Sequence, residues 1–230
     1  MMHRLFIVGD STAARKEACK KPMAGWGEYL ADYLDAPVSI INKAINGRST
    51  KSFLAEGHWA AIEQELRAGD YVFIQFGHND EKKEDPLRYT DPAHEYRRNL
   101  LHYIGTARRL GGIPVLLTPV SRRRFMNADV PDPLAVGLYP AAMRETAAET
   151  GTPLLDIFAA SQQLLQMMGH EHSEQLFMHL PQGNHPNYPE GIADDTHFSE
   201  EGAQHIARLV AETIAQSAAL SGLHPYLRAT

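Results

Sequence analysis

The stretch LFIVGDST, residues 5–12, lies close to the start of the chain and decides the class of fold. Its first four residues are apolar without alternation, which is typical of a parallel strand covered on both faces. The glycine, aspartate, serine and threonine that follow favour a turn. The stretch therefore predicts a buried strand whose carboxyl end carries a serine, Ser11.

Other short apolar runs rich in Val, Ile and Phe alternate along the chain with longer segments of helical periodicity, which is typical of βα units. The pattern predicts five strands, at Leu5–Val8, Val38–Asn42, Tyr71–Phe76, Pro114–Thr118 and Leu154–Asp156. It predicts six helices, at Gly27–Leu34, Phe53–Leu66, Ala93–Leu110, Tyr139–Glu149, Ile157–Met168 and Glu200–Leu220. We expect an α/β fold, a three-layer αβα sandwich of flavodoxin type around a five-stranded parallel sheet.

The composition limits the class of protein. A chain of 230 residues with 43% hydrophobic and 22% charged residues is typical of one globular domain, over residues 1–230. The formal net charge of −6 argues against nucleic acid or an anionic membrane as the main partner. Cys19 is the single cysteine and cannot form an internal disulfide. No signal-peptide pattern or membrane-length apolar segment is recognised, so we expect a cytoplasmic protein; a secreted protein trimmed of its signal would have the same sequence.

Polar blocks follow the first three predicted strands, and another precedes the last predicted helix. Ligand crevices of open parallel sheets lie beyond the carboxyl ends of the strands, so these blocks are expected to meet. They are Gly9-Asp10-Ser11-Thr12, Asn46-Gly47-Arg48-Ser49, Gly77-His78-Asn79-Asp80 and Asp194-Asp195-Thr196-His197.

Together the blocks contain what acyl transfer requires. A serine hydroxyl is a weak nucleophile until a neutral imidazole accepts its proton, and a carboxylate then orients the imidazole. Ser11 is the predicted nucleophile, His197 the base and Asp194 the orienting carboxylate. The three-residue spacing of Asp194 and His197 predicts a helical turn with both side chains on one side; Asp195 is the alternative. The backbone amides of Ser11 and Gly47 and the side-chain amide of Asn79 are the predicted oxyanion donors.

The four blocks resemble those of SGNH hydrolases, also called the GDSL-like family, in which Ser, Gly, Asn and His come in this order from separate blocks. Thr12 stands where the family name has leucine, and this form is similar to rhamnogalacturonan acetylesterases. The resemblance continues through Gly77–Asp80, Thr118–Arg122 and Asp194–Ser199. The G-x-S-x-G pentapeptide of the common α/β-hydrolases does not occur in the sequence.

The resemblance implies a flavodoxin-like SGNH hydrolase fold and a serine esterase that acts through an acyl-enzyme on Ser11. It implies an acetylated oligosaccharide as substrate, namely rhamnogalacturonan or related pectic material, and hence a role in pectin degradation. An SGNH lipase or thioesterase acting on other acyl esters is the alternative enzyme. A non-catalytic carbohydrate-binding protein on the same scaffold is the alternative outside enzymes, although binding alone does not require this set of residues.

Several other residues admit two interpretations. Trp26 could stack on a sugar ring, and the run Arg122-Arg123-Arg124 could bind the carboxylates of an acidic polysaccharide or form a solvated loop. Asp10, Asp80 and His78 are expected to be structural. Two segments, 120–137 and 170–194, resist regular assignment. The second contains histidines without a recognised zinc spacing, so no metal or other cofactor is expected: His170, His172, His179 and His185.

Overall fold

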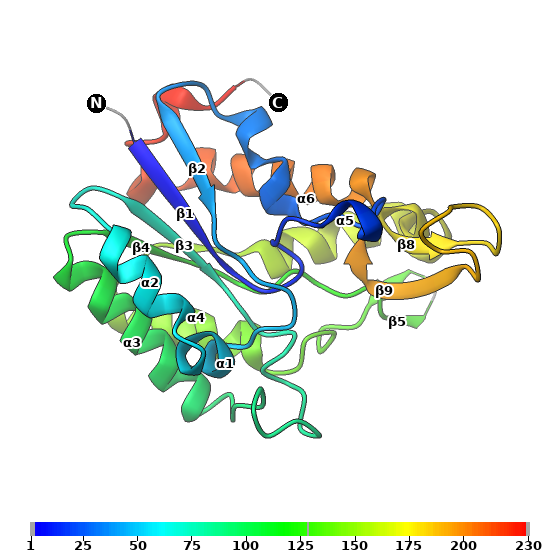
Figure 1. Cartoon of the computed structure of the whole chain (residues 1–230), viewed down its shortest axis with the longest axis horizontal. Coiled ribbons are helices and arrows are strands. Elements are labelled where there is room, and N and C mark those ends of the chain that lie inside the picture. Colours follow the sequence, from blue (N-terminus) through cyan, green and yellow to red (C-terminus); the bar gives the residue numbers. More distant parts are fainter. Residues whose placement is uncertain (1–2, 128, 229–230) are drawn as a thin grey trace.

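A five-stranded parallel sheet forms the centre of the molecule (Figure 1). The computed structural model describes residues 3–127 and 129–228. The strands lie in the order β2, β1, β3, β4, β7, which is the flavodoxin order. Their bounds are β1 (His3–Gly9), β2 (Val38–Asn42), β3 (Tyr71–Gln75), β4 (Ile113–Leu117) and β7 (Leu154–Leu155). The order reverses between β1 and β3, so a crevice is expected where these two strands end.

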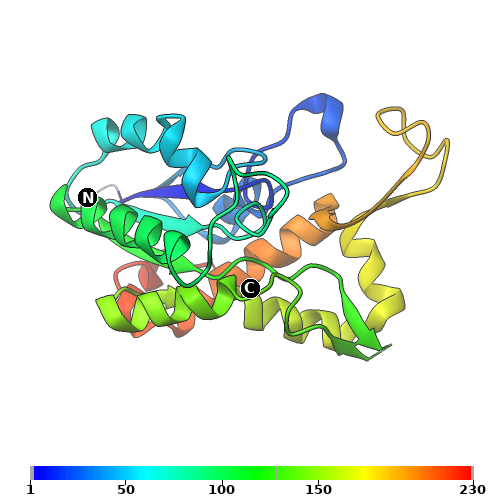
Figure 2. The same ribbon diagram turned by 90° about the horizontal axis from the view of Figure 1, so that it is seen from below.

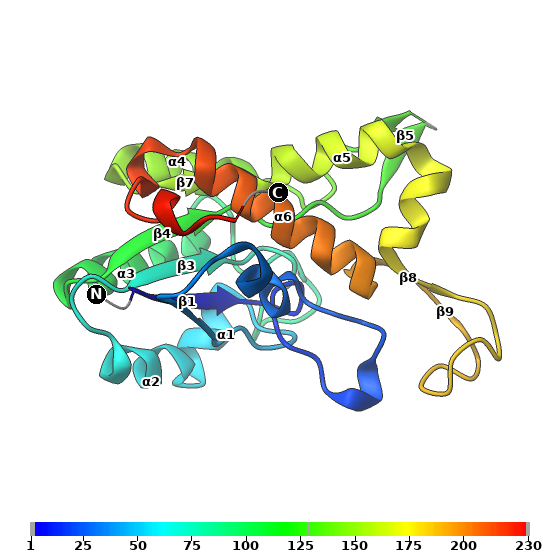
Figure 3. The same ribbon diagram turned by 90° about the horizontal axis from the view of Figure 1, so that it is seen from above.

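Helices cover both faces of the sheet and bury its continuous apolar strands. One core contains Phe6, Val8 and Ile74 from the sheet and side chains of α1 (Thr50–Ala55), α2 (His58–Glu65), α3 (Glu95–Arg109) and α4 (Tyr139–Thr150). The other contains Leu5, Ile7 and Phe73 and side chains of α5 (Ile157–His172) and α6 (Glu200–Gln216). Alternate residues of β1 thus face opposite cores, and Figure 3 shows the sheet between the two helical layers. The predicted three-layer α/β fold is confirmed.

Three predicted helices differ in detail. The helix predicted at 200–220 ends at Gln216, because Ser217 has an extended backbone. The helix predicted at 53–66 is divided into α1 and α2 by Gly57, which has a left-handed φ of 78°. The helix predicted at 27–34 is a pair of 3₁₀ helices, η2 (Trp26–Glu28) and η3 (Leu30–Tyr33), because its amides bond three residues back. The remaining 3₁₀ helices are η1 (Ala18–Lys20), η4 (Ser173–Leu176), η5 (Ala218–Leu220) and η6 (His224–Tyr226).

The two segments without a regular prediction each contain a β-hairpin. One consists of β5 (Phe125–Asn127) and β6 (Val130–Pro131), and the other of β8 (Phe177–Leu180) and β9 (Ile192–Phe198). Figure 2 shows the loop that joins β8 to β9 extending away from the layered body of the molecule. Strand β9 carries Asp194 and His197, so this hairpin brings the last polar block to the sheet.

Candidate active site

Ser11 lies two residues after the end of β1, at the carboxyl edge of the sheet, and is 7% exposed. The turn that carries it is fixed from below by the buried Asp10, whose Oδ1 accepts hydrogen bonds from the Thr12 amide at 2.9 Å and the Thr12 hydroxyl at 2.8 Å. The other oxygen of Asp10 lies 3.1 Å from His78 Nδ1. Burial raises the pKa of Asp10, but the His78 charge and these hydrogen bonds outweigh burial and hold the pKa below its ordinary value. This geometry supports the structural roles predicted for Asp10 and His78.

A continuous hydrogen-bonded chain joins the predicted nucleophile, base and carboxylate. Ser11 Oγ lies 2.9 Å from His197 Nε2, and His197 Nδ1 lies 2.7 Å from Asp194 Oδ2. Both distances are those of normal hydrogen bonds. Burial raises the pKa of Asp194, but the hydrogen bond and charge of His197 and two backbone amides outweigh burial and lower the pKa to about 2. The carboxylate is therefore ionised at neutral and mildly acidic pH and can stabilise a charged imidazole.

The helical turn predicted for Asp194 and His197 is wrong, because both residues lie on strand β9. Adjacent residues of β8, Phe177 and Met178, pair with Phe198 and Asp194, so residues 195–197 form a bulge in the ladder. Asp194 Oδ1 closes the bulge by accepting from the amides of Thr196 at 2.7 Å and His197 at 3.0 Å. The bulge brings side chains three residues apart to one side, as a helix would, and aims the imidazole at Ser11.

Asp195, the alternative carboxylate, is directed elsewhere. Its Oδ1 accepts from Arg123 Nη1 at 2.9 Å and lies 2.8 Å from His179 Nε2. Asp194 alone of the two contacts the His197 ring, and the geometry therefore favours Asp194 for the orienting role.

The three predicted oxyanion donors come from separate loops, which follow β1, β2 and β3 at the carboxyl edge of the sheet. Within residues 3–127 and 129–228, the backbone amides of Ser11 and Gly47 donate to no protein acceptor, so both remain available to a substrate oxygen. Gly47 has a left-handed φ of 76°, which glycine adopts without strain. The Asn79 side chain donates from Nδ2 to the Arg48 carbonyl at 3.1 Å and accepts at Oδ1 from Arg88 Nη1 at 3.3 Å. An amide nitrogen has two hydrogens, so Asn79 keeps one donor for substrate.

With this geometry established, comparison with known proteins identifies the family. A model of the GDSL-like Lipase/Acylhydrolase family matches residues 7–205. The chain belongs to this family. The family description and the arrangement of Ser11, His197 and Asp194 agree with a carboxylic ester hydrolase. The prediction of this class of enzyme is confirmed.

Two curated Bacillus subtilis proteins are similar over nearly the whole chain of this GDSL-like hydrolase. Rhamnogalacturonan acetylesterase RhgT is 42% identical over 212 residues, which are 92% of this chain and 89% of RhgT. The probable rhamnogalacturonan acetylesterase YesY is 37% identical over 218 residues, which are 93% of this chain and 93% of YesY.

Solved structures agree in fold. The Bacillus subtilis protein YxiM has a TM-score of 0.81 at 24% identity, over 94% of this chain and 57% of that one. Axe2, an acetylxylan esterase from Geobacillus stearothermophilus, has a TM-score of 0.63 at 19% identity, over 91% of this chain and 93% of that one.

Trp26 does not have the position predicted for it. Its side chain in this GDSL-like hydrolase is 0% exposed, and the indole Nε1 donates to Gln75 Oε1 at 2.5 Å. Gln75 in turn donates to the Thr12 hydroxyl at 2.8 Å. A buried indole has no free face for a sugar ring, and Trp26 instead supports the turn that carries Ser11 from inside the core.

Of the two interpretations of the three consecutive arginines, the geometry does not favour the binding of an acidic polysaccharide, because each guanidinium already has a carboxylate partner. Arg122 pairs with Glu81, Arg123 with Asp195 and Arg124 with Asp132. Paired charges leave little positive potential for an acidic substrate.

Two of these arginines instead hold the bulge between Asp194 and His197. Arg122 Nε donates to the Thr196 hydroxyl at 3.0 Å. The Arg123 amide donates to the Asp195 carbonyl at 2.9 Å, and the Arg123 side chain is buried beside the same residue. The bulge is therefore fixed from the loop that follows β4.

Lys16 is a component of the site that the sequence did not reveal. Its ammonium is buried and donates to the Ser11 carbonyl and, at 2.6 Å, to Asn46 Oδ1, so it joins the loop of the candidate nucleophile to the loop that carries Gly47. Burial lowers the pKa of Lys16 to about 8. A neutral amine still has two N–H donors, so both contacts can persist after deprotonation. The sequence feature that could have indicated Lys16 is a lysine five residues after the serine, close to the turn that carries it.

Asp80 and two histidines of segment 170–194, His170 and His179, have partners within the fold. Buried Asp80 accepts from the hydroxyl of Thr50 at 2.5 Å and that of Thr90 at 2.8 Å, as expected of a structural residue. Burial raises its pKa to about 7. His179 pairs with Asp195, and the His170 ring packs edge-on against Phe125. In the part of the chain that the structure describes, no three histidine, cysteine or acidic side chains are grouped to hold a metal ion.

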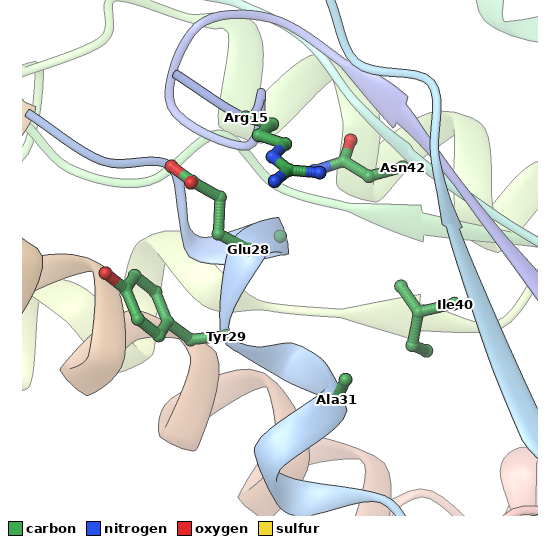
Figure 4. Close-up of a pocket in the computed structure, with 7 residues that line it drawn as sticks. Arg15, Glu28, Tyr29, Ala31, Ile40 and Asn42 are labelled. Carbon is green, nitrogen blue, oxygen red and sulfur yellow. The ribbon is translucent and has the colours of Figure 1, made fainter. Parts of the chain in front are cut away.

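A separate recess of about 480 Å³ lies between η2, η3 and strand β2 (Figure 4). Its lining includes Arg15, Glu28, Tyr29, Ile40 and Asn42, and the Arg15 guanidinium lies beside the Asn42 side chain. None of the candidate catalytic residues lines this recess. It is therefore distinct from the candidate active site.

Loss of the Asn79 amide is expected to lower kcat by about 10²–10³-fold, with a smaller change in KM, because one oxyanion donor acts mainly in the transition state. Steady-state kinetics of Asn79→Ala with a nitrophenyl acetate would measure both constants. A rise in KM with unchanged kcat would instead identify Asn79 as a contact of the bound substrate.

Proposed function

We propose that this GDSL-like hydrolase removes acetyl groups from carbohydrate through an acyl-enzyme on Ser11. The observation that carries the proposal is the 2.9 Å contact between Ser11 Oγ and His197 Nε2, with Asp194 held on the opposite ring nitrogen. A serine so placed can lose its proton to the imidazole as it attacks an ester carbonyl.

The reaction follows from the positions of the donors and acceptors. Ser11 Oγ attacks the acetyl carbonyl, and His197 takes the hydroxyl proton. The negative oxygen of the tetrahedral intermediate accepts from the amides of Ser11 and Gly47 and from Asn79 Nδ2. His197 then returns the proton to the sugar oxygen as its bond to the acetyl carbon breaks, which releases the free sugar hydroxyl and leaves an acetyl ester on Ser11. A water molecule, deprotonated by His197, hydrolyses that ester to acetate and free serine.

We propose acetylated rhamnogalacturonan, or a pectic oligosaccharide derived from it, as the substrate, and hence a role in pectin degradation. The support is the similarity to RhgT, which at 42% identity covers nine-tenths of the chain and is named for this activity. The structure of Axe2, at 19% identity, supports the fold alone.

As to location, no helix among the described residues is long and apolar enough to cross a membrane. We propose the cytoplasm as the compartment, where imported oligosaccharides would be the form of substrate encountered.

Acetate release from matched substrates tests the choice of substrate. The enzyme is expected to release acetate from acetylated rhamnogalacturonan oligomers with a kcat/KM at least about tenfold above that for acetylated xylo-oligomers, a difference of roughly 1.4 kcal/mol in transition-state binding. A nitrophenyl ester series from acetate to octanoate is the second arm, and activity should fall with chain length. Faster hydrolysis of the longer esters would favour the lipase or thioesterase alternative, and equal rates on both glycans would refute the preference for rhamnogalacturonan.

A further inference from the structure

The loop that follows β3 returns a cation, Arg88, to the edge of the candidate oxyanion hole. Arg88 Nη1 donates to Asn79 Oδ1 at 3.3 Å, while Asn79 Nδ2 donates to the Arg48 carbonyl at 3.1 Å. Building on the proposed function, we propose that Arg88 is a positioning residue that holds the Asn79 amide with its second N–H toward the substrate oxygen.

The chemistry of the two partners permits one orientation of the amide. A guanidinium has donors and no acceptor, and a backbone carbonyl has acceptors and no donor. A rotated Asn79 side chain would place its NH₂ group against Arg88 and its oxygen against the Arg48 carbonyl, so both contacts would be repulsive. Without Arg88, only the Arg48 carbonyl would oppose the rotated form, and the amide would lose part of its preorganisation.

Arg88 is itself fixed, so it can hold its neighbour. Its Nε donates to Asp85 Oδ2 at 2.5 Å, and the Asp85 carboxylate also accepts from the Leu87 amide at 3.0 Å. The Arg88 hydrogen bond lowers the pKa of Asp85, which keeps the carboxylate ionised and the pair intact at neutral pH. A guanidinium anchored at Nε presents Nη1 to Asn79 in a fixed direction.

The surrounding pocket favours positioning over binding of an anionic substrate. A cavity of about 270 Å³ is lined by Gly47, Arg88 and neighbouring residues, and Arg88 Nη1 lies 4.0 Å from where a Cβ on Gly47 would stand. Its two arginines are both paired, Arg48 with Glu56 and Arg88 with Asp85. The pocket therefore has no net positive charge to attract a carboxylate, whereas the contact with Asn79 is already formed.

A double-mutant cycle on a neutral substrate tests the proposal. Arg88→Met is expected to lower kcat for nitrophenyl acetate by about 10–100-fold and to change KM by less than about threefold, as loss of one hydrogen bond to a charged group would. In the Asn79→Ala background, the same substitution should lower kcat by less than about twofold, because residues that act through one contact are not additive. Arg88→Lys should recover part of kcat, since a single ammonium donor can reach the same oxygen.

Controls separate this role from a general loss of structure. Arg97→Met removes an arginine of α3 that is ion-paired with Glu149, and it should leave kcat and KM unchanged. Thermal melting of each variant reports the fold, and Arg88→Lys provides a second test if Arg88→Met melts early. Because nitrophenyl acetate carries no sugar, a failure of the proposed glycan preference would not affect this test.

Two results would overturn the proposal. Equal losses from Arg88→Met in the wild-type and Asn79→Ala backgrounds would show that Arg88 acts independently of Asn79. A rise in KM confined to uronate-containing oligomers, with normal kinetics on nitrophenyl acetate, would make Arg88 a carboxylate-binding residue.

Discussion

Ser11→Ala is expected to lower kcat by about 10⁴–10⁶-fold while the fold stays intact, since nucleophile and base act as one unit. Ser11 as a residue is 7% exposed, and its hydroxyl contacts His197, so the substitution removes the reacting atom and little packing. Hydrolysis of nitrophenyl acetate and release of acetate from glycan should fall together. His197→Ala should lower kcat by a similar factor, and the double variant should be scarcely worse than either single one.

The matched control for Ser11→Ala is Ser221→Ala, which changes an exposed serine on a turn near the carboxyl end of the chain. It should keep the activity and melting temperature of the wild type. Covalent labelling gives an independent readout. An organophosphonate should add its mass to Ser11 in the wild type and in Ser221→Ala. It should not label Ser11→Ala or the double variant, because both lack the Ser11 hydroxyl. Activity retained by Ser11→Ala after removal of contaminating esterase would refute the acyl-enzyme mechanism, and an unlabelled wild type would favour a carbohydrate-binding protein.

Asp194→Asn is expected to lower kcat by about 10²–10⁴-fold with little change in KM. Asp194 Oδ2 lies 2.7 Å from His197 Nδ1 and fixes the tautomer in which Nε2 can accept the Ser11 proton. An asparagine amide can donate to Nδ1, which stabilises the opposite tautomer, and it carries no charge to stabilise the imidazolium. Steady-state kinetics at neutral pH would measure the loss.

Asp195→Asn is the control for Asp194→Asn, because the two residues are adjacent and the same chemical change is made. Asp195 pairs with Arg123 and His179 and does not contact the His197 ring, so kcat should fall by less than about tenfold. A larger loss in Asp195→Asn than in Asp194→Asn would reverse the assignment of the orienting carboxylate.

Local sequence patterns were sufficient to predict the central sheet and the order of the polar blocks along the chain. Uninterrupted apolar runs such as Leu5–Val8 are local signals, and a parallel strand buried on both faces has this pattern wherever it occurs. Once the strands are known, the carboxyl edge of the sheet is known too, and the residues that follow each strand must lie there. Ser11 and Asn79 were found in this way because each comes directly after or within four residues of a strand end.

The surroundings of the site depend on long-range contacts that no local pattern predicts. Trp26 was predicted to face sugar because it follows the serine turn closely, yet its indole is drawn into the core by Gln75, 49 residues further along the chain. The arginines at 122–124 have the same charge and similar sequence positions, but the path of the backbone directs each to a different carboxylate. Sequence spacing says nothing about such partners.

The Asp194–His197 spacing and the Arg88–Asn79 contact show the same division. The three-residue interval fits a helical turn and a strand bulge equally well, and only pairing of β9 with β8 selects the bulge. Arg88 has no periodicity or motif to distinguish it from the other arginines of the chain. Its contact with Asn79 arises because the loop after β3 returns to the sheet edge, and where a loop returns depends on the whole fold rather than on local propensity. The local hydrophobic pattern therefore predicts the strands and the polar blocks that follow them. Long-range packing determines which other side chains contact the site.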